Sequence, residues 1–319
     1  MARIELRGLN LHGFPVAALA AYGLLRVLTE KGIAAKLGFD EAETLPRAFL
    51  EAEGMDERGL VKLLCRHALE ADPKRYGMEP GLPAREQDDR LWEEARRQLR
   101  TGEPAASFLV AYLNPWWQDG KGFVWSPLDT TGGNQSFSEF LKKTLKALQG
   151  KKARGALEAA FQRVLFRDVL LPPDPILQEE DPDHPLFGDL PGVKWHPSQK
   201  RSTADQAGVA REESGELTLR ISPAAVLLAW EAFPLYPFPP GRSRLPLGFA
   251  ERNSTPWILL PTPAYPVSLD LLRSLIALGP RASERSDDLT LWASPRHKGG
   301  IRDYPVFMDA QRWDSLNFS

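Results

Sequence analysis

The stretch 3–37, RIELRGLNLHGFPVAALAAYGLLRVLTEKGIAAKL, decides how the chain begins to fold. Residues 3–7 alternate polar and apolar side chains, which predicts a short strand. Pro15 then occupies the favoured first position of a helix, and the small and apolar residues after it cover most of the helix circumference. Gly32 ends this buried helix, and residues 33–37 alternate again. The sequence therefore predicts a strand–helix–strand opening.

Further along, the patterns predict a mixture of helices and strands. Helical periodicity covers 44–71, with a break near Gly54, whereas 107–113 fits either a helix or a strand. Other expected helices are 86–99, one beginning near 137, 152–170, 223–232 and 268–278, and other expected strands are 123–125, 217–221, 244–249, 256–261 and 306–308. The last forty residues otherwise look like loops. We expect an α+β protein with a mostly helical N-terminal half and a mixed, proline-rich α/β C-terminal half.

Residues 172–206 mark the expected boundary between the two halves. They are rich in Pro, Asp, Gly and Ser, a composition typical of a linker or a long functional loop. The predicted division is therefore an N-terminal domain at 1–171, the linker at 172–206 and a C-terminal domain at 207–319.

Composition excludes several classes of protein. With 43% hydrophobic and 26% charged residues in 319, the chain can bury a sizeable core. A formal net charge of −2 excludes a uniformly basic coat. Cys65 is the single cysteine, so no disulfide framework or cysteine-based metal site can form. The apolar stretch 14–28 is too short and interrupted to cross a bilayer, so we expect a cytoplasmic protein with no membrane partner.

Catalytic motifs are scarce in this sequence. The five histidines lack metal-ligand spacing, and neither a Walker loop nor a Gly-x-Ser-x-Gly elbow occurs. Cys65 lies in a helical pattern as a packing thiol, and His67 falls on a different helix face. We expect no enzyme activity and no cofactor or metal. A metal-dependent nuclease that uses Asp129, Asp181 and Asp183 remains the least favoured alternative.

The segment 142–167 indicates contact with nucleic acid. It holds eight basic residues against one acidic residue, a net +7 in a chain of −2. Such a local field suits phosphates, although a solvated helix face explains the lysines equally well. The basic residues are Lys142, Lys143, Lys146, Lys151, Lys152, Arg154, Arg163 and Arg167.

A glycine–amide loop precedes this basic segment. Its residues Gly132, Gly133, Asn134 and Gln135 lie just before a capping-box pattern that starts a helix. Glycines permit close backbone approach to a duplex, a helix N-terminus offers amide donors to phosphate, and Asn and Gln read base edges. A simple tight turn is the alternative.

Scattered cationic and aromatic residues add weaker signals. The cations lie in the linker, in a glycine-containing turn and before Gly299: Lys194, His196, Lys200, Arg201, Arg242, Arg244, Arg296, His297 and Lys298. The nine tryptophans include Trp116, Trp117, Trp195 and Trp257, which suit either base stacking or packing in a core or interface.

Three segments together resemble a known family. They are 9–28, LNLHGFPVAALAAYGLLRVL, then 131–137, TGGNQSF, and 228–239, LAWEAFPLYPFP, which is followed by a Gly-Phe turn at 248–249. In this order the set resembles CRISPR-associated proteins of type I interference systems, in particular the large-subunit-like proteins of the I-U (I-G) subtype.

The resemblance implies a non-catalytic subunit of a crRNA-guided Cascade surveillance complex. Such a subunit checks the flanking motif (PAM) on target double-stranded DNA, helps open the duplex and presents the complex to a separate helicase-nuclease. It implies crRNA, target DNA and other Cascade subunits as partners, including a separate small subunit because 319 residues is short for a large one. The resemblance implies that Asn134 and Gln135 read the flanking DNA motif. It implies that the nucleic-acid backbone is guided by Lys142, Lys143, Lys146, Lys151 and Lys152. A scaffold subunit that only holds its neighbours is the main alternative.

Overall fold

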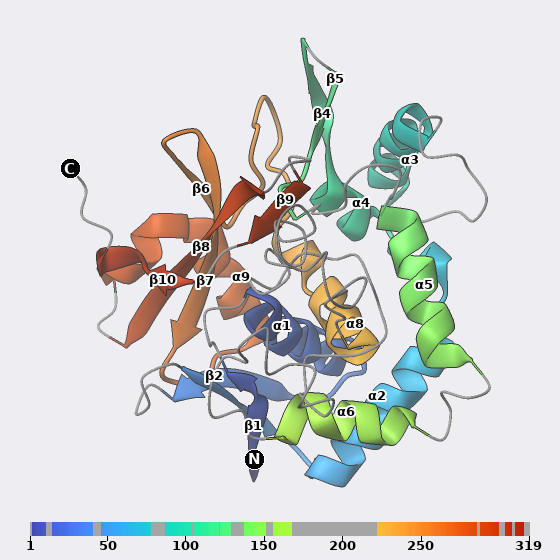
Figure 1. The fold of residues 1–319 in the computed structure, drawn as a ribbon, viewed down its shortest axis with the longest axis vertical. Coiled ribbons are helices and arrows are strands. Elements are labelled where there is room, and N and C mark those ends of the chain that lie inside the picture. The colour runs from blue at the N-terminus through green and yellow to red at the C-terminus, as the bar shows by residue number, and fades with distance from the viewer. Residues whose placement is uncertain are drawn as a thin grey trace, which may run out of the picture.

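The structure is a computed structural model that describes residues 2–10, 15–40, 46–77, 87–103, 105–120, 122–128, 137–150, 156–167, 222–285, 288–299, 304–307 and 310–315. Helices and antiparallel sheets both occur in it, so the expected α+β class is confirmed (Figure 1). The predicted linker 172–206 and strand 217–221 lie outside the described residues. The division into domains therefore stays a prediction.

The predicted strand–helix–strand opening is confirmed. Strand β1 (Ala2–Asn10) leads to helix α1 (Pro15–Glu30), and strand β2 (Ala35–Asp40) follows. Every residue of α1 from Pro15 to Leu28 is buried, as expected for a helix that is apolar on all sides. Gly32 adopts a positive φ of 74°, which a glycine accepts without strain, and the helix ends there.

The opening strands flank a third one that the sequence analysis placed in a helix. Strand β3 (Arg47–Ala52) lies between β1 and β2 and is antiparallel to both. The expectation of helix from residue 44 was wrong, because this central strand is buried on both faces and lacks alternation. Helix α2 (Glu57–Glu70) begins only after Asp56, whose side chain accepts a hydrogen bond from Gly59 N at 2.6 Å.

Helix α8 (Pro223–Glu231) packs directly on α1 at the centre of the molecule (Figure 1). The two backbones come so close that a Cβ atom on Gly23 would lie 1.7 Å from the carbonyl oxygen of Leu228. Helices α5 (Phe137–Gln149) and α6 (Leu157–Phe166) cover α8 and α2, and α6 also lies against β1. These helices confirm those expected near 137, 152 and 223. One hydrophobic core spans the chain from Ile4 to Ala310.

A second antiparallel sheet is built from the C-terminal region. Its strand order is β10-β8-β7-β6, and β9 also pairs with β8. The bounds are β6 (Phe249–Arg252), β7 (Thr255–Pro263), β8 (Leu289–Gly299), β9 (Tyr304–Phe307) and β10 (Gln311–Arg312), with 3-10 turns η4 (Gly279–Arg285) and η5 (Trp313–Ser315) beside them. The expected strand 256–261 and helix 268–278 correspond to β7 and α9 (Leu269–Leu278).

Two expectations for this region were wrong. The strand placed at 244–249 begins only at Phe249, and residues 244–248 are turn-like. The final forty residues are not loops with one short strand, because β8 alone pairs with β7, β9 and β10. Strand β8 pairs with β7 and β10 across intervening elements, and no local pattern specifies such partners, whereas β8 and β9 are consecutive strands. An isolated bridge between Leu37 and Val267 connects this part of the molecule to β2.

The middle of the chain forms a helix pair and a projecting hairpin. Helix α3 (Gln87–Thr101) confirms the helix expected at 86–99. The segment 107–113, which fitted either a helix or a strand, is helical up to Tyr112 as part of α4 (Ala106–Tyr112). Strands β4 (Leu113–Asp119) and β5 (Gly122–Trp125) then form a two-stranded hairpin that points away from the body (Figure 1). Two 3-10 turns, η1 (Pro73–Tyr76) and η3 (Phe233–Leu235), complete the described elements.

Candidate functional site

Glu231, the last residue of α8, carries a carboxylate that is completely buried. The rest of α8 from Ala224 to Trp230 is apolar and buried on all sides, so this helix carries its final residue into the interior. An ionised carboxylate is costly to bury unless cations and hydrogen-bond donors surround it. The neighbouring elements supply both.

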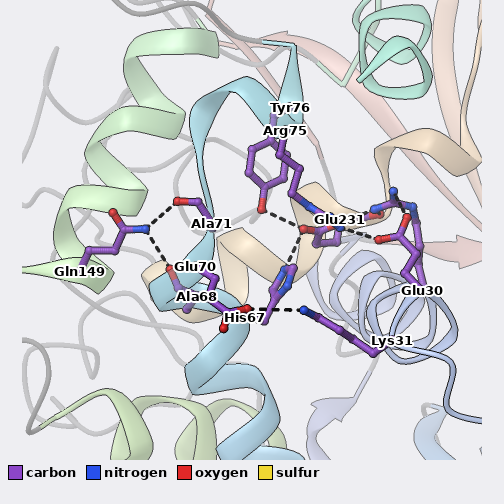
Figure 2. A network of polar contacts seen from close by, with 11 residues as sticks. Glu30, Lys31, His67, Ala68, Glu70, Ala71, Arg75, Tyr76, Gln149 and Glu231 are labelled. Atoms are coloured by element: carbon purple, nitrogen blue, oxygen red, sulfur yellow. Dashed lines mark hydrogen bonds and ion pairs between the residues drawn. The ribbon is translucent and has the colours of Figure 1, made fainter. Parts of the chain in front are cut away.

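Four side chains from three other elements converge on this carboxylate, and Figure 2 shows His67, Arg75 and Tyr76 among them. His67 Nε2 of α2 lies 2.8 Å from Oε1, and the Tyr76 hydroxyl of η1 donates to the same oxygen at 2.8 Å. Arg26 of α1 forms an ion pair with Oε2, and Arg75 Nη2 lies 3.4 Å from that oxygen. Because a carboxylate only accepts hydrogen bonds, His67 donates from Nε2. Both oxygens of Glu231 are therefore fully engaged.

Glu30 closes the arrangement at its outer edge. It forms ion pairs with Arg26 through one carboxylate oxygen and with Arg75 through the other. The guanidinium of Arg26 also lies over the Phe108 ring, 4.7 Å from its centroid. Arg26 is buried, whereas the Glu30 and Arg75 side chains are 36% and 37% exposed. We call this group the Glu231 network: Arg26, Glu30, His67, Arg75, Tyr76 and Glu231.

The network fixes the protonation of its central groups. Burial alone would raise the pKa of Glu231, but the hydrogen bond and charge of His67 and the charges of Arg26 and Arg75 lower it to about 2. Burial and the nearby carboxylate raise the pKa of Tyr76 well above its usual value. Glu231 is therefore ionised and Tyr76 protonated across the physiological range. Because the carboxylate is enclosed by protein, this chemistry suits holding α8 against α1 and α2 rather than proton transfer to a ligand.

The sequence patterns did not predict this network, and Arg26 and Glu231 were assigned no role. A signal was present, because the buried stretches 15–28 of α1 and 223–231 of α8 each contain one charged residue, Arg26 and Glu231, and the two charges are opposite. Cys65 packs against the core from α2, and burial raises the pKa of its thiol.

The described part of the predicted DNA-binding set lies mainly on α5. Leu141, Leu145 and Leu148 form its buried stripe and pack into the core. Lys146 is exposed and Lys142 is half-buried, and neither makes an ion pair with a residue that the structure describes. Gln149, at the end of α5, donates to the carbonyls of Ala68 (3.0 Å) and Ala71 (2.7 Å) at the end of α2 (Figure 2). The amphipathic helix thus presents lysine to solvent.

Most of the remaining predicted site residues lie outside the described ranges. Lys143 is placed by its backbone in α5, without its side chain. The others outside the description are Gly132, Gly133, Asn134, Gln135, Lys151, Lys152, Arg154, Lys200 and Arg201, together with Asp129, Asp181 and Asp183 of the nuclease alternative. Their roles stay predictions.

Arg296 and Lys298 belong to a strand rather than to a terminal loop. Both lie on β8, opposite Phe307 and Pro305 of β9, and Arg296 is half-buried. The sheet and α5 occupy different sides of the molecule (Figure 1). The structure therefore does not bring these two residues together with the α5 lysines.

The described residues contain neither a candidate metal-binding cluster nor a candidate membrane-spanning helix. No group of three or more His, Cys, Asp or Glu side chains in them is arranged to hold a metal ion. None of the helices found there has the length and apolar character needed to cross a membrane. No family model matches the chain, and no curated protein matches it.

Proposed function

We propose that this chain is a non-catalytic subunit of a crRNA-guided type I CRISPR effector complex in the cytoplasm. In that role it binds target double-stranded DNA and reads the flanking motif to start duplex opening, together with crRNA, backbone and small subunits and a separate helicase-nuclease. The proposal starts from the resemblance of the segments 9–28, 131–137 and 228–239.

One observation carries the proposal beyond the sequence. The first and third of these segments, far apart in the chain, meet as α1 and α8 at the centre of the core. Arg26 of the first and Glu231 of the third form the buried ion pair of the Glu231 network. The described residues of the first and third segments thus belong to one structural unit, which favours a common origin for these two segments over chance matches.

The same unit carries the basic helix. Helix α5 packs on α8 through its leucine stripe, and the loop 131–136 directly precedes this helix. In the proposed role, Lys142 and Lys146 contact phosphates, and Asn134 and Gln135 read base edges. Backbone contact and base reading would then come from adjacent parts of one helix–loop element.

Salt dependence of duplex binding tests the backbone contact. Fluorescence anisotropy of a labelled duplex of about 30 base pairs is measured between about 50 and 200 mM salt. The Lys142→Glu/Lys146→Glu variant removes two phosphate contacts, so we expect the slope of log K against log salt to fall by about 1.8 in magnitude, at roughly 0.9 per contact. The matched control is Lys36→Glu/Lys62→Glu, which reverses two exposed lysines on β2 and α2.

Base reading is tested with Asn134→Ala/Gln135→Ala in the presence of co-expressed partner subunits. We expect this variant to bind duplexes with different flanking sequences equally while it keeps the wild-type salt slope. If neither double variant changes duplex binding, the proposal is refuted and the scaffold subunit becomes the favoured alternative. Metal-dependent cleavage by the purified chain, lost on Asp→Ala substitution at 129, 181 or 183, would point to the nuclease alternative.

A further inference from the structure

The β4–β5 hairpin exposes the largest apolar side chain at the surface of the described residues. Trp116 on β4 is 41% exposed. Its neighbour Trp117 is half-buried and packs against Val110, Val124 and Phe238. The hairpin projects from the body, and no third strand among the described residues pairs with it (Figure 1). An exposed indole therefore lies on a projecting element that its neighbour anchors.

A single buried amide fixes the backbone that carries Trp116. Asn114 is fully buried, and its Oδ1 accepts hydrogen bonds from Trp116 N (2.9 Å) and Trp117 N (3.2 Å). Its Nδ2 donates to the carbonyl oxygens of Gly241 (3.2 Å) and Ser243 (2.8 Å). One side chain thus joins the start of the hairpin to the turn 241–245, although more than a hundred residues separate them in sequence.

The joined turn brings two cations to this place. Arg242 and Arg244 flank Ser243, and both side chains are exposed. Neither forms an ion pair or hydrogen bond with a residue that the structure describes. The turn itself is tight, since the Ser243 hydroxyl donates to Leu245 O at 2.6 Å. Two exposed guanidinium groups therefore lie on the turn that Asn114 joins to the backbone of Trp116.

The hairpin is also supported from its other strand. Phe123 of β5 packs on Trp92 of α3, with ring centroids 5.8 Å apart. The Trp92 indole nitrogen donates to Asn114 O at 3.2 Å, and the Arg96 guanidinium lies 4.6 Å from the Trp92 ring centroid. An isolated two-stranded hairpin is marginal in water, but this one is tied down on both sides. Its geometry is set before any ligand arrives, which lowers the entropic cost of binding.

We propose that Trp116, Arg242 and Arg244 form a binding surface for single-stranded nucleic acid. An unpaired base stacks on the Trp116 indole, and the two arginines contact the flanking phosphates. The inference rests on the proposed function and deepens it, because a subunit that helps open a duplex must meet an unpaired strand. An exposed aromatic side chain and exposed arginines, carried by two segments that one buried amide joins, make up an arrangement that single-strand binders use.

The test uses the full chain and labelled oligonucleotides of about 15 nucleotides, with thymidine DNA and uridine RNA as separate arms. Trp116→Ala removes the stacking ring, so we expect binding to weaken by about 5- to 150-fold with an unchanged salt slope, since no ionic contact is lost. Trp116→Phe keeps a ring and should retain most of the affinity. Arg242→Gln/Arg244→Gln should lower the slope magnitude by about 1.4, at roughly 0.7 per single-strand phosphate.

Tyr265→Ala is the matched control, because this aromatic side chain is 66% exposed away from the hairpin. If Trp116→Ala and the double arginine variant both bind the oligonucleotides with wild-type affinity, the inference is overturned. The hairpin would then be assigned to a protein contact. The two proposals fail separately. Duplex binding that depends on Lys142 and Lys146, without single-strand binding that depends on Trp116, refutes only the inference. The reverse pattern refutes only the duplex-reading role.

Discussion

Substitution of Glu231 by Gln should remove a large share of the stability of the fold. The change keeps the side chain's size but deletes its charge, and it leaves Arg26 buried beside a neutral amide. Breaking a buried ion pair by removing one partner costs about 3–5 kcal/mol. The lowered pKa of Glu231 points in the same direction, because its partners favour the ionised carboxylate in the folded chain.

The pH dependence of this loss has a defined sign. A carboxylate whose pKa is lower in the folded chain stabilises the fold fully above its unfolded pKa, and this contribution disappears as pH falls. For Glu231 the relevant window runs from 4.5 down to about 2. The difference in unfolding free energy between wild type and Glu231→Gln should therefore be constant above about pH 6 and should shrink by about 2 kcal/mol by pH 3.

Urea unfolding followed by circular dichroism at several pH values measures this difference. Glu70→Gln is the matched control, because Glu70 pairs with Lys31 at 3.5 Å on the surface and should change stability by less than about 0.5 kcal/mol. A Glu231→Gln variant that unfolds within about 1 kcal/mol of wild type at pH 7, or whose deficit does not depend on pH, would refute the reasoning.

Two further predictions concern close packing. Gly23→Ala should destabilise the fold by about 1–3 kcal/mol in the same urea assay, because the new Cβ meets the backbone of Leu228 and forces α1 and α8 apart. Gly120→Ala, which adds its methyl group in open space, is its control, and equal midpoints for the two variants would contradict the argument. Asn114→Ala should free both the hairpin and the turn 241–245, seen as faster amide hydrogen exchange at Trp116 and Trp117. Unchanged exchange there would show that Asn114 is not the anchor.

Some elements were predictable because their signals are local. Helix α1 combines a proline at its first position, a glycine at its end and an unbroken apolar run, and all three act within one segment. Helix α5 likewise shows its leucine stripe in the sequence. Strand β3 was missed because Ala48, Phe49 and Leu50 are all buried, so a strand covered on both faces shows no period of two.

The rest depended on partners that no local pattern specifies. Strand β8 contains Pro295 and several polar residues, and its pairing with β7, β9 and β10 makes it a strand. The Glu231 network brings together residues from α1, α2, η1 and α8, with Arg26 and Glu231 separated by 205 positions. Asn114 and the turn 241–245 are a second such case. Charged or amide side chains in apolar segments were the available signal, but their partners became identifiable only in three dimensions.

The pairing of α1 with α8 has a consequence for how the chain folds during synthesis. Helix α1 ends at Glu30, yet the helix that covers it is completed only at residue 231, so α1 leaves the ribosome long before α8. Until then the nascent chain carries a strongly apolar helix without its partner, an aggregation-prone state that attracts chaperones. Because α8 also supplies the counter-charge for Arg26, its packing on α1 both excludes water and pairs the buried cation. Slow translation of the residues before α8 would prolong the time during which α1 is exposed.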